Sequence, residues 1–315
     1  MAKRLHITAL IAFTLLICSC TKEDNTQCPG DVRVYFSLLS AQSNPADVDR
    51  MHLYVFDANG LFLRDYRDPH IASFNSEYYI ECAGLLPGSY RFVAWAGRDD
   101  SHYTTTPSAF AQGRTTYQEA LLFLKHTGGL VSTHPHHIFH SEKLAVVTQE
   151  REQRINMPLA QLTNTINVRT EGFPSDDNAY LFNIVDNNCA YNFDRSFALH
   201  DGHLSDETFS YTTPCTKDDS KQLSATLRVL RLSGSRRIPQ LQLYNKTQGK
   251  LLFPADEKAG DLIEMILKAY NPNFDTTHKY DIVLRFSEDD TTGLKVQVFI
   301  NGWEVKEQGG DLIDG

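Results

Sequence analysis

The sequence predicts an all-β protein made of two β-sandwiches in tandem, with one or two short helices. Many short segments alternate apolar and polar residues with a period of two, which is typical of half-buried strands. Turn pairs such as Asn-Gly and Pro-Gly separate these segments, and few segments have the spacing of a helix. The chain of 315 residues is long enough for two ordinary domains, and 41% of it is apolar, enough for a buried core.

The chain begins with the features of a secretory signal peptide at residues 1–19. A basic head precedes an apolar run at residues 7–17, which is shorter than the about 20 apolar residues that a membrane span needs. The run ends in the pattern of a bacterial lipoprotein box, Ile17-Cys18-Ser19-Cys20. Because a small residue must precede the acylated cysteine, we expect Cys20, not Cys18, to be the lipidated N-terminus. An ordinary cleaved signal peptide and a chance apolar N-terminus are the alternatives.

A polar tether at residues 20–30 follows this cysteine. A lipoprotein cysteine normally carries more than one acyl chain, and two or more chains hold a protein at a membrane effectively for good. No later segment could cross a membrane, so we expect the lipid to be the only anchor. The run Lys22-Glu23-Asp24 is either a solvated spacer or, as in Bacteroidetes-type lipoproteins, similar to a signal for transfer to the outer leaflet.

The mature chain is acidic. Removing residues 1–19 leaves 28 basic and 39 acidic side chains, a net charge of −11. Because such a surface repels phosphate backbones, we expect no nucleic-acid partner.

Four cysteines remain once Cys18 leaves with the signal and Cys20 is acylated: Cys28, Cys82, Cys189 and Cys215. An exported chain permits disulfides, and four cysteines allow three pairings that the sequence cannot separate. Proximity in sequence favours Cys189–Cys215, with Cys28–Cys82 as the other pair. Free thiols are the alternative.

The first sandwich is expected at residues 31–160. Its strands are predicted at residues 32–36, 51–56, 61–63, 78–81, 90–97 and 144–148. The turns lie at residues 57–60 and 87–89, and residues 99–112 are expected to form a loop. The segment 90–97 is apolar on both faces and should lie centrally. Residues 117–125 are interpreted as a short helix.

The second sandwich is expected at residues 161–315. Its strands are predicted at residues 165–169, 180–185, 224–232, 241–244, 250–253, 280–286, 294–300 and 303–305. Apolar residues between 262 and 270 recur at three and four, which predicts a short helix that Asp261 caps. Asn301-Gly302 should turn the last hairpin, and residues 306–315 form a polar, frayed tail.

No catalytic constellation stands out. The sequence contains no phosphate loop, Gly-x-Ser-x-Gly elbow or His-Glu-x-x-His motif. Adjacent carboxylates lie in expected loops and are interpreted as turn residues: Asp99-Asp100, Asp176-Asp177, Asp218-Asp219 and Asp289-Asp290. We therefore expect neither enzymatic activity nor a cofactor.

The densest group of potential metal ligands is the histidine-rich segment at residues 134–140, with His126 upstream and Glu142 after it. If residues 136–140 form a strand, His136 and His140 lie on one face about 13 Å apart. One metal with bonds near 2 Å cannot bridge that distance, so a site would need a turn here and ligands from elsewhere. We expect no metal and interpret the segment as a polar, partly exposed strand edge.

Four aromatic side chains could stack on sugars or fill the sandwich core, and we favour the core: Tyr78, Tyr79, Trp95 and Trp303.

Taken in order, several segments resemble the fimbrial-anchor lipoproteins of Bacteroidetes, relatives of the anchor subunits of Porphyromonas major and minor fimbriae. They are Cys20 with its acidic follower and the segments at residues 28–36, 52–60, 86–97 and 300–303. The likeness covers most of the chain and is weak from about 173 to 260.

This resemblance implies two transthyretin-like β-sandwiches with Greek-key connections. It also implies that lipid, palmitate included, attaches the protein to the outer membrane. The protein would then lie at the base of a fimbria (pilus), exposed at the cell surface. The resemblance further implies that a strand of the stalk subunit, or pilin, completes an open sheet edge of the anchor. The short acidic tail after Val305 leaves no alternating strand to donate, which agrees with a chain that only receives. The sequence does not identify the accepting edge.

Two other functions remain open at this point. One is a surface glycan-binding lipoprotein or fimbrial tip adhesin with the same fold, and the other is an exported hydrolase, which has the least support.

Overall fold

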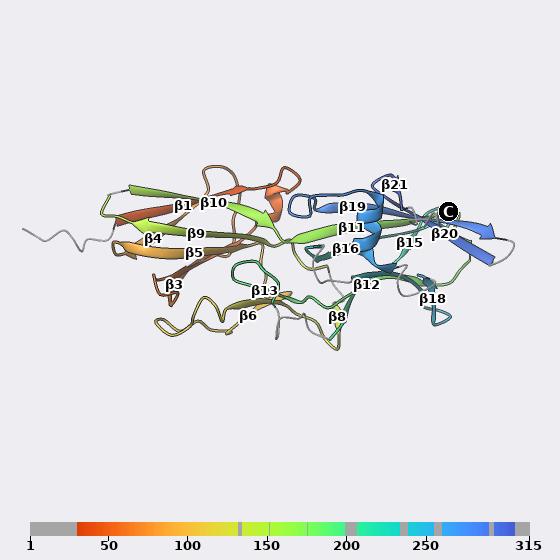
Figure 1. The fold of residues 1–315 in the computed structure, drawn as a ribbon, viewed down its shortest axis with the longest axis horizontal. Helices are drawn as coiled ribbons and strands as arrows, with labels where there is room; N and C mark the ends of the chain where they lie inside the picture. The colour runs from red at the N-terminus through yellow and green to blue at the C-terminus, as the bar shows by residue number, and fades with distance from the viewer. Residues whose placement is uncertain are drawn as a thin grey trace, which may run out of the picture.

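The computed structural model describes residues 30–131, 134–150, 152–174, 176–198, 207–233, 239–254, 260–289 and 293–305. It is elongated, and the chain enters it at one end of the long axis (Figure 1). The expected signal peptide, the lipidation site Cys20, the tether, Cys28 and the tail lie outside the described residues. No helix in the described ranges is long and apolar enough to span a bilayer.

The first half of the chain forms a seven-stranded sheet that folds over itself. Its strands, in spatial order, are β3 (Phe62–Asp68), β2 (Met51–Phe56), β5 (Gly88–Ala96), β9 (Phe139–Val147), β10 (Glu152–Gln161), β1 (Gly30–Leu38) and β4 (Tyr79–Leu85). β9 and β10 pair only at Ala160–His140 and Gln161–Phe139, so the halves on either side face each other. Their inward side chains share one core, to which β1 contributes Val32 and Val34 and β2 contributes Leu53.

A three-stranded sheet covers the second face of the β2–β5–β9 half. It consists of β13 (Ala190–Asn192), β7 (Leu121–Leu124) and β6 (Tyr103–Thr106). β5 is therefore buried on both faces. Phe92 packs into the core inside the seven-stranded sheet, called the first core below, and Val93 and Trp95 pack into the core beneath the three-stranded sheet. This confirms the central position expected for residues 90–97.

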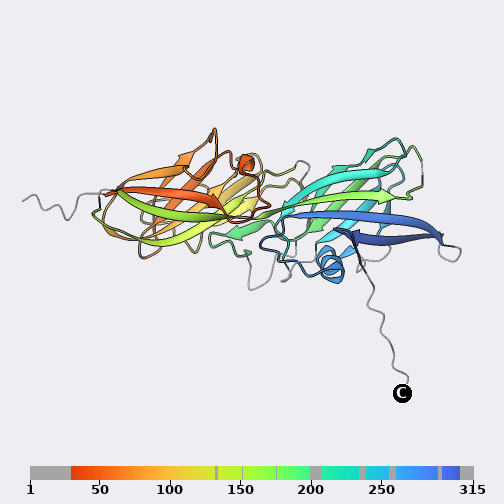
Figure 2. The ribbon, with the colours of Figure 1, turned by 90° about the horizontal axis from the view of Figure 1, so that it is seen from above.

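The second half of the chain forms a sandwich of two sheets. The six-stranded sheet contains β15 (Thr216–Lys217), β16 (Leu223–Leu230), β11 (Thr163–Glu171), β19 (Lys279–Asp289), β20 (Gly293–Ile300) and β21 (Trp303–Glu304). The five-stranded sheet contains β18 (Lys250–Phe253), β17 (Gln240–Asn245), β12 (Tyr180–Asp186), β14 (Phe209–Pro214) and β8 (Leu130–Val131). Figure 1 shows the two sheets edge-on as facing layers, with β11 and β19 in one and β12 and β18 in the other, and Figure 2 looks down on them, with β11 and β19 side by side. The all-β class and the tandem sandwiches are thus confirmed.

One α-helix and one 3-10 turn complete the described elements, α2 (Leu262–Ala269) and η2 (Pro45–Asp47). The carboxylate of Asp261 accepts hydrogen bonds from the backbone N–H groups of Ile263 and Glu264, each at 3.0 Å. The predicted helix and its cap are therefore confirmed.

Two short strands cross between the halves. β8 pairs with β14 of the second half, and β13 pairs with β7 of the first. One hydrophobic core, which includes both Trp95 and Ile300, runs through the junction. β10 leads through Leu162 into β11, and these two strands run along much of the molecule (Figure 1).

Some local expectations were wrong. Residues 117–125 contain strand β7 and no helix, because Leu121–Leu124 pair with β6 and β13 on both sides. β10 and β14 were not predicted, although Ile155, Met157 and Leu159 alternate at period two and point into the core.

The structure also corrects the expected disulfides, because Cys82, Cys189 and Cys215 carry free thiols. Cys215 follows β14 beside the start of β12, where its N–H donates to Tyr180 O, whereas Cys189 lies beyond the other end of β12. The length of β12 separates them by on the order of 20 Å, far more than a disulfide spans. Cys82 is fully buried in the first core, where burial raises the pKa of its thiol to about 12.

Candidate acceptor edges and the surface groove

Within the described residues, the edge of β20 offers unpaired backbone groups at the end of the molecule far from the chain entry (Figure 1). β20 pairs with β19 along its whole length, but β21 pairs with it only at Phe299 and Ile300. Val305 N–H then donates to Val298 O at 2.8 Å. In the part of the chain that the structure describes, nothing pairs with this edge before Val298.

The alternation of an antiparallel ladder fixes which groups face outward. Val298 points its carbonyl toward β21, and Asn301 N–H donates in the opposite direction, to Asp281 O of β19 at 2.8 Å. By the same alternation, the N–H and C=O of Val296 face away from β19. An incoming strand could accept and donate hydrogen bonds there.

The side chains of β20 suit a shared core. Val298 and Ile300 are buried, and Val296 on the same face is only half-buried. Lys295 is exposed on the other face. A strand added beside β20 would cover Val296 with its own inward side chains.

A tight turn joins β20 to β21. Asn301 and Gly302 both adopt positive φ, 50° and 86°, as the predicted Asn-Gly turn requires. The turn positions Trp303 directly opposite Ile300. Trp303 is 63% exposed, so the expectation that it fills the core was wrong, whereas Trp95 is fully buried as expected.

The edges of the first half are less open. Arg64 Nη1 and Tyr66 OH of β3 both donate to Ala83 O of β4, at 3.1 and 2.9 Å, and so connect the two edge strands. Tyr78 packs against the core beside them, and its hydroxyl donates to Asp68 at 3.1 Å. The side chains of Arg64 and Tyr66 therefore already bridge the edges of β3 and β4.

An exposed apolar pair lies elsewhere on the first half. Leu144 and Val146 are both exposed on β9 and line a hollow of about 400 Å³ beside the turn at Asp57–Gly60. This apolar surface on β9 is a second exposed surface, with which the edge of β20 can be compared as a binding site.

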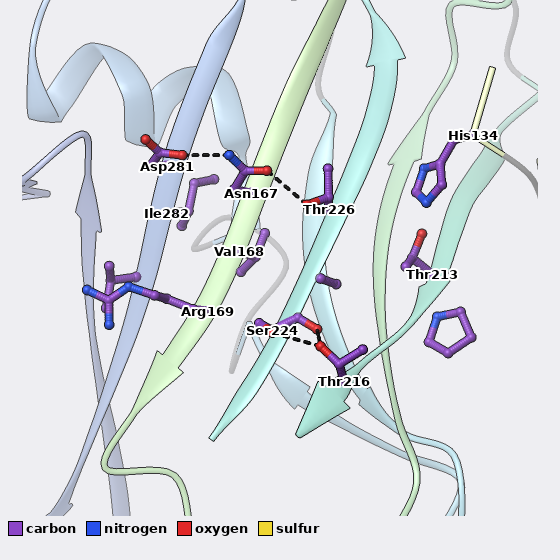
Figure 3. A pocket seen from close by; sticks show the side chains of 13 residues that line it. His134, Asn167, Val168, Arg169, Thr213, Thr216, Ser224, Thr226, Asp281 and Ile282 are labelled. Carbon is purple, nitrogen blue, oxygen red and sulfur yellow. Dashed lines mark hydrogen bonds between the residues drawn. The ribbon is translucent and has the colours of Figure 1, made fainter. Parts of the chain in front are cut away.

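A groove of about 580 Å³ lies on the outer face of the six-stranded sheet (Figure 3). A ladder of side chains crosses three strands at its floor: Asn167 donates to Asp281 at 2.7 Å, and Thr226 donates to Asn167 at 2.9 Å. His134, Thr213 and Pro214 form the opposite side. The amide of Asn167 is thus satisfied at both ends by its neighbours, and none of the described residues that line the groove is Phe, Tyr or Trp.

The histidine-rich segment is buried from His137 to His140, whereas His134 and His136 are exposed. β9 lies between β5 and β10, and only Phe139 and His140 of the segment are within it. His140 Nε2 donates to Phe193 O at 2.7 Å, and burial lowers the pKa of its imidazole to about 4. His137 Nδ1 lies 2.7 Å from Thr163 Oγ1, and burial lowers its pKa to about 3. The segment is therefore partly exposed as expected, but the expected strand edge was wrong, because β9 is an inner strand.

A buried polar network that the sequence did not reveal lies on β2 and β3. His52 Nε2 is 2.7 Å from Asp65 Oδ2, and His52 Nδ1 is 2.9 Å from Tyr54 OH. Arg98 donates to the same phenol at 3.1 Å. Burial raises the pKa of Tyr54 to about 12, so the phenol stays protonated and serves as a hydrogen-bonding partner. The strand at residues 51–56 and the turn after it were predicted, but the predicted second strand, residues 61–63, stops before Asp65, so the network was not foreseen.

Several of the adjacent carboxylates act as turn residues, whereas Asp289 is the last residue of strand β19. Asp218 accepts from the N–H groups of Ser220 and Gln222, both at 2.9 Å. Asp176 accepts from Asn178 N–H at 3.0 Å. Asp290 lies outside the described residues.

Two sandwiches of mostly antiparallel sheets with an open edge are an architecture common among structural and binding proteins. The model of the family "Fimbrillin-A associated anchor proteins Mfa1 and Mfa2" matches residues 25–309. The chain therefore belongs to this family of fimbrial anchor proteins, and the resemblance noted in its sequence is confirmed.

Individual proteins that are similar to this chain in sequence or fold include fimbrial anchor proteins. The minor fimbrium anchoring subunit Mfa2 of Porphyromonas gingivalis is 26% identical over 324 residues, which cover 96% of this chain and 94% of the relative. The solved structure of the fimbrial anchor protein Mfa2 from the same species matches with a TM-score of 0.73 at 22% identity, covering 89% of this chain and all of the other. A putative polysaccharide binding protein from Bacteroides thetaiotaomicron matches with a TM-score of 0.70 at 23% identity, covering 89% and 99%.

Proposed function

We propose that this chain is an outer-membrane lipoprotein that fixes a fimbria to the cell surface and holds the stalk subunit by strand complementation. Membership of the anchor family carries the fimbrial role. The lipoprotein box at Cys20 supports the lipid attachment, and the open edge of β20 supports the strand exchange. The chain carries out no catalysis in this proposal.

The shape suits this role. The described chain begins at one end of the long axis, and β20 lies toward the other (Figure 1). Lipid at Cys20 would hold the first half near the membrane, and the second half would present β20 to the fimbria. We accordingly propose that residues 31–160 form the membrane-proximal unit and residues 161–315 the partner-binding unit.

The lipid attachment is tested with Cys20→Ala. Without its acyl chains the protein should detach from the membrane, so fimbriae should appear in the culture medium, and mass spectrometry should find acyl chains only on the wild-type N-terminus. Cys18→Ala is the matched control and should leave fimbriae cell-bound. Fimbriae that stay on Cys20→Ala cells would contradict the proposal.

The strand exchange is tested at Val296. Val296→Pro removes an outward N–H without removing a β19 hydrogen bond, so it should abolish co-purification of the stalk subunit while the chain still folds. Lys295→Ala is the control, because it changes only an exposed side chain. Binding of the stalk by folded Val296→Pro at the wild-type level would exclude this edge.

A glycan-binding or tip-adhesin function makes a different prediction. Changing Asn167 and Thr226 in the groove to alanine would then abolish sugar binding, and Cys20→Ala would leave the fimbriae attached. The mutually satisfied ladder of the groove favours the anchor function.

A further inference from the structure

Three potential metal ligands converge outside the surfaces described so far. Asp99 and His102 lie in the loop after β5, and His136 lies in the segment that leads from β8 to β9. One ligand atom from each residue lies within 4.8 Å of the other two. Asp99 Oδ2 is 2.9 Å from His102 Nδ1 and 4.0 Å from His136 Nδ1.

The loop directs the Asp99 carboxylate toward the imidazoles. Its Oδ1 accepts from the N–H groups of Ser101 and His102, both at 2.8 Å, and from the Ser101 hydroxyl. Oδ2 faces the two rings, and Oδ1 also lies 3.0 Å from His102 Nδ1. Burial acts to raise the pKa of Asp99, which is only 5% exposed, but the hydrogen bonds from Ser101 and His102 outweigh it and lower that pKa to about 2. The carboxylate is thus an anion already held in place.

The main chain around His136 is also fixed. Tyr103 OH donates to His136 O at 2.7 Å, and Arg228 Nη1 donates to Pro135 O at 2.9 Å. The rings of His102 and His136 are 5.7 Å apart and inclined by 33°. The His136 side chain is 49% exposed, so an ion and a water could enter from solvent.

We propose that Asp99, His102 and His136 bind one divalent first-row transition metal, with Zn²⁺ as the best fit, through Asp99 Oδ2 and the two Nδ1 atoms. Ligand atoms at about 2.0–2.1 Å from a tetrahedral Zn²⁺ lie roughly 3.3 Å from one another. The separations of 2.9 and 4.0 Å bracket this value, so a small movement of the half-exposed His136 completes the set. Imidazole and carboxylate donors suit Zn²⁺ better than Ca²⁺ or Mg²⁺, which prefer oxygen ligands alone.

The metal would tie together parts of the chain that belong to different sheets. The segment with His136 runs from β8, in the five-stranded sheet, to β9, in the seven-stranded sheet. The loop with Asp99 and His102 extends from β5 of the seven-stranded sheet. The ion therefore clips the crossover segment to the first half and stiffens the junction. This role does not depend on the proposed anchor function.

The test uses the mature chain with Cys20→Ala, treated with a chelator and titrated with Zn²⁺ in calorimetry. We expect one Zn²⁺ per chain and a rise in Tm that saturates at that ratio. His136→Ala should weaken Zn²⁺ binding at least tenfold and abolish the rise in Tm, because it removes one of three ligands. His70→Ala, at an exposed histidine outside the cluster, should bind like the parent.

Substitution with Co²⁺ gives an independent measurement. Its visible absorption bands should show tetrahedral coordination in the parent chain and should be lost in His102→Ala. Equal Zn²⁺ affinity in the parent and in folded His136→Ala would overturn the proposal, as would the absence of a saturable rise in Tm.

Discussion

Acid should destabilise the protein before its carboxylates titrate, because three histidines are buried as neutral rings. They are His137, His140 and His278, whose exposed fractions are all below 10%. Burial lowers the pKa of His137 to about 3 and that of the other two to about 4. In the unfolded chain each imidazole titrates near 6.5.

The direction of the pH dependence follows from the number of protons that the folded and unfolded chains bind. Below pH 6.5 the unfolded chain takes up protons that the folded chain does not, so the free energy of unfolding falls as pH falls from about 6.5 toward 4. Between pH 7 and pH 5 each histidine loses about 2 kcal/mol of stabilisation, since one pKa unit corresponds to about 1.4 kcal/mol. The three together lose on the order of 6 kcal/mol, comparable to the whole stability of many domains.

His140 offers the best single test. Its ring donates a hydrogen bond to Phe193 O and packs edge-on against Trp95, with the ring centroids 4.7 Å apart. Arg195 and Arg231 lower the pKa further, and Asp194 opposes them. His140→Gln keeps a donor but cannot be protonated. Urea unfolding of the Cys20→Ala chain at pH 7 and pH 5 should show a difference that is about 2 kcal/mol smaller in this variant.

The exposed His70 provides the control, and His70→Gln should keep the full difference between pH 7 and pH 5. If His140→Gln loses as much stability between these pH values as the parent chain, the reasoning about a neutral buried imidazole is refuted.

Two further predictions concern the backbone at Gly97 and the thiol of Cys82. Gly97→Ala should destabilise the chain by well over 1 kcal/mol, because its Cβ would lie 2.1 Å from His137 O. Gly113→Ala, at a similar φ but with no atom within 4 Å, should show only the smaller cost of positive φ in thermal unfolding. The thiol of Cys82 should react with a thiol reagent only as fast as the chain unfolds, because it is fully buried with a pKa of about 12, and fast labelling under native conditions would contradict this burial.

The sequence was informative where a local pattern determines the structure. The alternation in β1, the Asn301-Gly302 turn and the Asp261 cap are properties of a few neighbouring residues. β7 was misinterpreted because a short apolar run such as Leu121–Leu124 does not by itself distinguish a strand from a helix. Its strand form depends on β13, nearly 70 residues later in the chain.

The candidate sites depended still more on distant pairing. Asn301-Gly302 predicts a hairpin, but the open length of β20 follows only from where β21 stops. For the histidine-rich segment, the strand assumed over residues 136–140 was wrong, because β9 begins at Phe139 and His136 lies before it. The partners of His136 come from the loop at residues 99–102, and no spacing in the sequence connects the two.

The most direct test of the central claim is a crosslink in intact cells. A photoreactive residue at position 295, beside the open edge of β20, should capture the fimbrial stalk subunit, and the same residue in place of the exposed Leu144 should not. Capture of the stalk subunit from position 144 alone, or from neither position, would contradict an anchor that accepts its partner on β20.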